Sequence, residues 1–161
     1  MMIRNPDIHD AENISECIRA SSTGDTHDGS AEGIADWMAL SSPEEIRERI
    51  ASGERNVIAV KGSQVVGYIS FKRTNHLSLL YVREGSKRQG IGRQLFQKAA
   101  NGLNEITLNS SDEAIPFYLA LGFLMTGERF HKKGAWSTPM KWNNCAQQTH
   151  APDAQKRAGD A

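Results

Sequence analysis

Cysteine is scarce in this sequence of 161 residues and occurs only as Cys17 and Cys145, near the two ends. Two cysteines so far apart show no metal-ligand spacing, so neither a metal site nor a disulfide framework is expected. An excess of charge is lacking too, because 19 lysines and arginines balance 19 aspartates and glutamates. General nucleic-acid binders normally carry a clear basic excess. We therefore expect neither a metal nor a nucleic acid as a partner.

Long apolar runs are also absent. None approaches the length of a membrane span, and the first residues contain no apolar signal core. We therefore expect a cytoplasmic, reduced protein with no membrane partner. The length suits one domain with its own core, predicted over 1–144. The remaining residues, 145–161, have no apolar periodicity and are predicted to be a disordered tail.

Apolar periodicity predicts alternating strands and helices. Short apolar or alternating runs predict strands at 1–4, 56–60, 64–72, 76–82, 105–109, 122–130 and 134–142. Helical spacing of apolar residues predicts helices at 10–20, 31–40, 41–52, 91–100 and 110–123. Hairpins at both ends surround a strand–helix–strand–helix section. This order predicts an α/β fold with antiparallel ends and a parallel pair of strands near the middle.

Glycines and cations gather where the run at 76–82 gives way to the helix at 91–100. Gly90 and Gly92 would let the backbone approach a ligand closely, and Lys87, Arg88 and Arg93 supply positive charge. A helix N-terminus presents unpaired N–H groups that bind anions, phosphates above all. The stretch can therefore hold a phosphorylated cofactor, although a plain strand-to-helix turn with solvated cations remains an alternative.

Two common phosphate motifs do not fit this stretch. The dinucleotide fingerprint needs a third glycine where Leu95 stands. The P-loop needs a Gly-Lys-Ser/Thr sequence, which is missing. The cofactor is therefore not assigned by either motif.

A second motif follows in the helix predicted at 110–123. Its apolar residues recur at positions i, i+3, i+4 and i+7, so they share one face of the helix. Ser110 or Ser111 is expected to cap the start, and Gly122 to end the helix in a left-handed conformation. The residues of the shared face are Ala114, Phe117, Tyr118 and Leu121.

Taken in order, the two segments "LLYVREGSKRQGIGRQLFQKAA" and "LNSSDEAIPFYLALGF" resemble the GNAT acyl-CoA N-acyltransferases. The cofactor motif of that family is Gln/Arg-x-x-Gly-x-Gly/Ala after a strand that ends in valine. Here Lys87 stands at the Gln/Arg position and Val82 ends the strand. Ser111 stands where many members have asparagine, with Asn109 two residues earlier. The resemblance covers residues 2–142.

The resemblance implies a mixed, mostly antiparallel sheet of about six to seven strands flanked by about four helices, with a parallel pair splayed at the cofactor site. It implies an N-acetyltransferase that moves an acetyl group from acetyl-CoA to a primary amine of a small molecule or peptide. The cofactor-binding residues it implies are Leu80, Tyr81, Val82, Lys87, Arg88, Gln89, Gly90, Ile91, Gly92, Arg93, Asn109 and Ser111.

Acyl transfer from a thioester needs a group that protonates the departing thiolate. Tyr118 is our candidate, because a phenol with a pKa of about 10 is protonated at pH 7 and can donate to a thiol of pKa about 8.5. Its position on an apolar helix face fits equally a core tyrosine. The carbonyl oxygen would be stabilised by strand backbone around Leu80 to Val82.

The attacking amine must also lose a proton. His76 titrates in the right range to take it, directly or through water. A strand period of two would place its side chain on one face with those of Ser78, Leu80 and Val82. The family often uses a glutamate on this strand, which is missing here, and a strand-edge histidine without a role is the alternative. Residues 21–41 are expected to shape the acceptor pocket.

Two other functions remain open from sequence alone. One is a non-catalytic module that binds acyl-CoA, against which the presence of Tyr118 speaks. The other is a nucleic-acid binder that uses the cations at 87–93, against which the balanced charge speaks. A homodimer through the closing strands is also left open.

Overall fold

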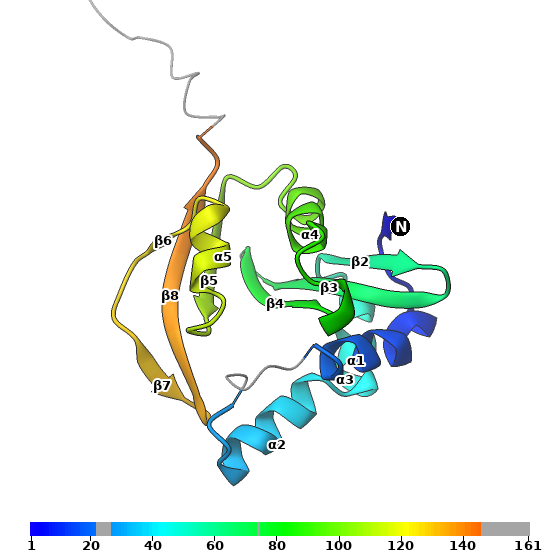
Figure 1. Cartoon of the computed structure of the whole chain (residues 1–161), viewed down its shortest axis with the longest axis horizontal. Helices are drawn as coiled ribbons and strands as arrows, with labels where there is room; N and C mark the ends of the chain where they lie inside the picture. Colours follow the sequence, from blue (N-terminus) through cyan, green and yellow to red (C-terminus); the bar gives the residue numbers. More distant parts are fainter. Residues whose placement is uncertain (22–26, 74, 146–161) are drawn as a thin grey trace, which may run out of the picture.

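The computed structural model describes residues 1–21, 27–73 and 75–145 (Figure 1). Most of the predicted tail, 146–161, therefore lies outside the described residues. The strands of the described part are β1 (Met2–Arg4), β2 (Asn56–Lys61), β3 (Gln64–Lys72), β4 (His76–Val82), β5 (Glu105–Ser110), β6 (Leu124–Met125), β7 (Phe130–Lys132) and β8 (Ala135–Asn143). The helices are η1 (Ile8–Asp10), α1 (Ala11–Arg19), α2 (Ala31–Leu40), α3 (Pro43–Ala51), η2 (Glu84–Ser86), α4 (Ile91–Ala99) and α5 (Ile115–Ala120).

The strands form one sheet in the order β1-β2-β3-β4-β5-β8-β6, with β7 paired to β8. Every pairing is antiparallel except that of β4 with β5. The predicted fold class is confirmed. The described part contains eight strands, one more than the seven predicted from the sequence pattern, and five α-helices, as that pattern predicted. The extra strand arises because the run predicted at 122–130 is split into β6 and β7. Between them, the Thr126 N–H donates to the Pro139 carbonyl.

Two hydrophobic cores sandwich the sheet (Figure 1). The helix α4 covers one face, and α1 and α3 cover the other. The first core also takes in α5 and contains Ile91, Leu95, Phe96, Ile106, Tyr118 and Phe123. The second contains Ile14, Cys17, Ile18, Ile46, Ile58 and Tyr68. No helix of the described residues is long and apolar enough to cross a membrane.

The helix α5 begins later than its sequence suggests. The expected serine cap is wrong, because Ser110 still belongs to β5 and its hydroxyl donates to the Ser111 carbonyl at 2.8 Å. A turn follows, and the helix starts at Ile115 without a side-chain cap. Gly122 ends the helix with φ +97°, as predicted. The short helix therefore sits one turn farther from β5 than the pattern indicates.

A β-bulge interrupts β4. Ser70 of β3 lies opposite Leu79, while its neighbour Phe71 lies opposite Leu77. Ser78 is thus an extra residue with no counterpart on β3. The bulge places two successive side chains on the same face and reverses the alternation beyond it.

The bulge contradicts the expectation that four residues of this strand share a face, because that expectation assumed an unbroken period of two. Beyond the bulge, Leu80 and Val82 pack against the α4 core, together with Leu77 before it. Leu79 and Tyr81 instead pack against the core of α1 and α3. Each core thus receives its own set of β4 side chains.

The β7–β8 hairpin reaches across to the start of α2 (Figure 1). Its turn contains Gly134, whose carbonyl accepts from the Asp28 N–H at 2.7 Å. The Asp28 carboxylate lies 2.9 Å from His131 Nε2. Hydrogen bonds from Ser30, and next that of His131, lower the pKa of Asp28 to about 2. These contacts tie the end of the chain to its first third.

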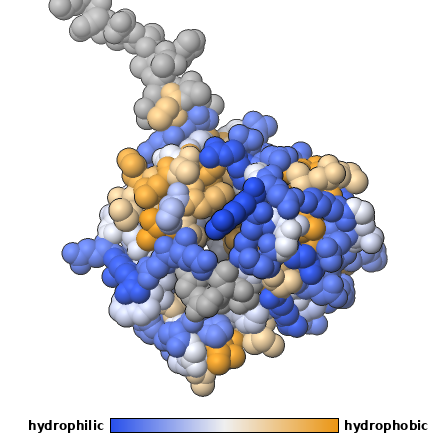
Figure 2. All heavy atoms as spheres, in the orientation of Figure 1, coloured by the Kyte–Doolittle hydropathy of each residue, from blue (hydrophilic) through white to orange (hydrophobic). Residues whose placement is uncertain are grey.

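Hydrophobic surface gathers over α5 and β6 (Figure 2). Phe117, Leu119, Leu124 and Met125 are exposed there. This patch lies on the closing part of the sheet. Nothing in a single chain tests the homodimer considered above, which stays a prediction.

The contact of the hairpin with α2 predicts a large difference between two glycine substitutions. Gly134 and Gly62 both have positive φ, +68° and +59°, so alanine is strained at either position. A Cβ on Gly62 would meet open space, whereas one on Gly134 would lie 2.5 Å from the Gly33 nitrogen. We expect Gly62→Ala to cost about 1 kcal/mol of unfolding free energy and Gly134→Ala about 3 kcal/mol or more, by urea denaturation. Equal losses would show that the hairpin does not pack on α2.

Candidate active site

An opening in the sheet lies between β4 and β5. Their parallel pairing joins His76 with Thr107 and Leu77 with Leu108, and in the described residues it extends no further. Beyond that point the two strands diverge (Figure 1). The divergence leaves one edge of β4 without a neighbouring strand, next to the bulge.

Two backbone N–H groups of β4 face this opening. The Arg83 N–H donates to the Val66 carbonyl at 2.9 Å and so points toward β3. Successive residues of a strand present their N–H groups to opposite edges. The N–H groups of Leu80 and Val82 therefore point away from β3 and toward β5. They are placed to pair with an extended ligand or to stabilise a carbonyl oxygen.

The glycine-rich loop leads from the end of β4 into α4. Arg88 and Gly90 both take left-handed backbone conformations, with φ +60° and +75°. Gly90 is the residue before α4, and no side chain caps this end of the helix. The first N–H groups of a helix have no partner within it, so this end can bind an anion. The positive φ explains the glycine at position 90.

The cations of the loop surround the start of α4, but some are engaged. Lys87 Nζ lies 2.6 Å from the Glu84 carboxylate. Gln89 accepts a hydrogen bond from the ammonium group of Lys61. Arg93 Nη2 approaches the carbonyl of Ala120 at 3.5 Å, and its side chain is exposed, as is that of Arg88. Lys61 is a further cation here that sequence reasoning missed, because it lies 28 residues earlier.

Gly92 has a second reason to be glycine. A Cβ at this position would lie 3.0 Å from Cζ of Phe117 in α5. Its small size lets α4 and α5 approach each other beside the opening. Packing thus explains this glycine, while its predicted contact with a cofactor stays a prediction.

Tyr118 projects from α5 into the core beside the opening. It is buried and packs against Phe117 and Phe123, with ring centroids 5.2 and 5.4 Å away. Burial, and secondly the electrostatic influence of Tyr81, raises the pKa of Tyr118 above its usual value. The hydroxyl is therefore protonated at every physiological pH.

The comparisons with known proteins decide the family. Residues 25–144 match the family model described as "Acetyltransferase (GNAT) domain". This chain belongs to the GNAT acetyltransferase family. A curated relative is an uncharacterized N-acetyltransferase, YafP of Escherichia coli K12, 27% identical over 122 residues that cover 75% of this chain and 79% of that protein. The family assignment made from the two sequence motifs is confirmed.

Solved GNAT structures share the fold. The PaiA N-acetyltransferase of Thermoplasma acidophilum, in complex with coenzyme A, superposes with a TM-score of 0.73 at 21% identity. The superposition covers 89% of this chain and 98% of the PaiA chain. A GCN5-related N-acetyltransferase of Rhodopseudomonas palustris gives 0.72 at 24% identity, with 89% and 95% covered. These likenesses confirm the GNAT fold.

His76 lies at the closed end of the opening in this acetyltransferase. Its Nδ1 is 2.9 Å from the hydroxyl of Thr107, its partner across the parallel pair. Burial, and secondly the charge of Lys72, lowers the pKa of His76. The residue is about 13 Å along the strand from Leu80, at about 3.3 Å per residue. The structure therefore does not bring His76 to the cofactor loop, and its role as a base stays a prediction.

Asn109 and Ser111 stand at the other side of the opening. Asn109 is exposed near the end of β5, opposite Pro139 of β8, and Ser111 follows the strand. Their contact with a cofactor stays a prediction. The segment expected to shape the acceptor pocket is described in part, since 22–26 lie outside the described residues.

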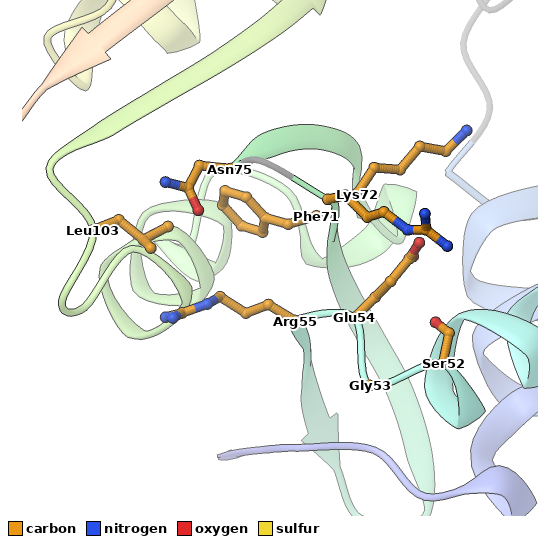
Figure 3. Close-up of a pocket in the computed structure, with 9 residues that line it drawn as sticks. Ser52, Gly53, Glu54, Arg55, Phe71, Lys72, Asn75 and Leu103 are labelled. Carbon is orange, nitrogen blue, oxygen red and sulfur yellow. The ribbon is translucent and has the colours of Figure 1, made fainter.

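A surface hollow of about 270 Å³ is lined by Glu54, Arg55, Phe71, Asn75 and Leu103, among others (Figure 3). These residues surround the end of β3 and the start of β4. The cofactor loop follows the far end of β4, so this hollow is not part of the candidate site. Within the described residues, no three His, Cys, Asp or Glu side chains gather as a metal site would require.

The environment of His76 predicts its titration. With a lowered pKa, its midpoint by NMR should fall below the ordinary 6.5. Lys72→Gln should raise the midpoint part of the way back, since burial remains. The unfolded chain binds a proton at a higher pH than the folded one, so the stability tied to His76 is fully present above pH 6.5 and is lost as the pH falls toward the lowered value. A midpoint at or above 6.5 would contradict this environment.

Proposed function

We propose that this chain transfers an acetyl group from acetyl-CoA to a primary amine of a small molecule or peptide, by direct attack of the amine on the thioester. The observation that carries the proposal is the open edge of β4. It presents the N–H groups of Leu80 and Val82 and leads directly into the glycine loop at the start of α4. A free strand edge followed directly by a phosphate-binding turn suits a long cofactor that has an extended arm and a pyrophosphate.

In this proposal the pyrophosphate binds the first N–H groups of α4, supported by the exposed Arg88 and Arg93. The pantetheine arm pairs with the edge of β4 and lies between this strand and β5. The coenzyme A bound by the Thermoplasma acidophilum relative supports a CoA-based donor. The residues present fit such a donor, because an unpaired strand edge leads into a helix N-terminus that no side chain caps.

The acetyl transfer requires groups for three tasks: stabilising the thioester oxygen, protonating the sulfur and accepting the proton of the amine. The developing negative charge on the thioester oxygen is stabilised by a backbone N–H of β4. Tyr118 donates its proton to the sulfur as the carbon–sulfur bond breaks, and the raised pKa keeps that proton in place beforehand. The amine forms the new carbon–nitrogen bond and releases its own proton to water or to His76, which is neutral at pH 7. The products are an acetylated amine and CoA.

A thiol-release assay tests the function. The full chain is incubated with acetyl-CoA and a panel of amines, polyamines, amino acids, aminoglycosides and peptide N-termini, and free thiol is measured. Release that depends on one acceptor, with an acetylated product by mass spectrometry, supports the proposal. Binding of CoA without turnover on any acceptor would instead identify a non-catalytic acyl-CoA-binding module.

The proposed pyrophosphate site predicts that charge matters at one end of α4 and not at the other. Arg93 lies in the first turn of the helix and Lys98 in the last, and both are exposed. We expect Arg93→Gln to weaken CoA binding about fivefold to tenfold, because a charge-assisted contact with phosphate is lost. Lys98→Gln is the matched control and should leave the Kd unchanged. Isothermal titration with CoA makes the comparison, and equal effects would place the phosphates elsewhere.

The proposed acid predicts the effect of removing one hydroxyl. Tyr118→Phe keeps the ring between Phe117 and Phe123. Turnover should fall about 100-fold while the Kd for CoA barely changes, because the lost interaction strengthens mainly in the transition state. Because the raised pKa keeps the phenol protonated, ionisation of Tyr118 should not lower the rate even at pH values near the ordinary tyrosine pKa of about 10.

The measurement needs an identified acceptor and conditions in which chemistry limits the rate. A core tyrosine would lose one hydrogen bond, worth about 1 kcal/mol of stability, with little change in turnover. Turnover within a few-fold of wild type would therefore exclude the acid role and leave Tyr118 as packing.

A further inference from the structure

A buried arginine lies beneath the bulge of β4. Arg49 projects from α3 and is 5% exposed. Its Nη1 donates to the hydroxyl of Ser78 at 2.9 Å and approaches that of Ser70 at 3.4 Å. Ser78 is the extra residue of the bulge, and Ser70 lies opposite Leu79 on β3. One guanidinium therefore bridges a helix to the point where β4 departs from regular pairing.

The charge of Arg49 is compensated without a ligand. Its Nε donates to the Glu45 carboxylate at 2.9 Å, and Nη1 lies 3.7 Å from Glu54. The carbonyl of Arg49 accepts from the side chain of Asn56 at 3.2 Å, which fixes the end of α3 to β2. Burying a cation is costly unless it is paired and hydrogen-bonded, as here. The arrangement thus holds the guanidinium in one place and leaves Nη1 directed at the strand.

The position of the bulge decides which backbone groups of β4 face the opening. Parallel pairing with β5 ends at Leu77, the residue before the bulge. In a strand, successive N–H groups point to opposite edges, and the extra residue shifts this alternation by one position. The N–H groups of Leu80 and Val82 therefore point toward β5, whereas without the bulge those of Leu79 and Tyr81 would do so. A bulge that moved or relaxed would misplace these two N–H groups.

We infer that Arg49 is a positioning residue that holds the bulge through the Ser78 hydroxyl and thereby sets the β4 edge for the pantetheine arm. This inference rests on the proposed function, because it assumes that CoA uses that edge. Arg49 itself touches no ligand. It acts on the pantetheine half of the cofactor and not on the phosphates, which bind at the start of α4.

The two halves of the cofactor allow a direct test. Isothermal titration compares the Kd of CoA with that of adenosine 3′,5′-bisphosphate, which lacks the pantetheine arm. Ser78→Ala removes the hydroxyl from the bulge, and we expect CoA to bind about fivefold to tenfold more weakly while the bisphosphate binds as before. Ser70→Ala is the matched control, since it removes the other hydroxyl near the same guanidinium but from β3, across from the bulge and not within it. It should leave the ratio of the two Kd values unchanged.

A double-mutant cycle separates Arg49 from a direct contact of Ser78 with the ligand. In the wild-type background, Arg49→Met should weaken the binding of CoA. In the Ser78→Ala background it should cause no further change in the ratio of the Kd of CoA to that of the bisphosphate. Arg49→Lys, which keeps the charge, serves where the methionine variant does not fold.

The outcomes are distinct. A ratio that stays at the wild-type value in both Ser78→Ala and Arg49→Lys overturns the inference. An equal change in Ser70→Ala also overturns it, because a general loosening of β3 and β4 would then be the cause. If the wild-type chain binds no CoA, the proposed function fails, whereas tight binding with an unchanged ratio in the variants removes only the role of Arg49.

Discussion

The short parallel pairing of β4 with β5 is the constraint on which the rest of the site depends. Parallel neighbours need a crossover, and here η2, the glycine loop and α4 supply it. Because the pairing stops after Leu77, the crossover begins from a strand with one free edge. The same few residues thus produce an unpaired strand edge and, immediately after it, a helix N-terminus. An elongated anionic cofactor could use both only if the strands part where they do.

The two cores keep the strands apart. Leu80 and Val82 are held by the core that includes α4, and Leu79 and Tyr81 by the core of α1 and α3. A slip of β4 by one residue would exchange these sets and mismatch both cores, so apolar packing opposes closure of the opening. On the other side, α5 packs the ring of Tyr118 against that of Phe123. Burial that stabilises the fold also raises the pKa of that phenol.

What could be read from the sequence was local. The turn at Gly90, the apolar stripe of α5 and the left-handed end at Gly122 follow from chemistry within a few residues, and each is present. The bulge could not be read, because it depends on how β3 pairs with β4, and the Arg49 side chain that contacts it lies 29 residues earlier. In the sequence Arg49 looks like the exposed partner of Glu45 one helical turn away. A lone serine within the apolar run at 76–82 was the available signal.

The balanced net charge conceals an uneven distribution of charge over the structure. Near the start of α4, Lys61, Lys87, Arg88 and Arg93 outnumber the single carboxylate of Glu84 that pairs there. At the hairpin contact, Asp28 and Asp36 instead meet His131 and Lys133. Positive charge in excess therefore lies at the cofactor end, where phosphates would bind, and is matched by carboxylates where the hairpin meets α2. A charge count over the whole chain could not show this separation, because it sums the charges without their positions and because Lys61 joins the cations of the loop only through the fold.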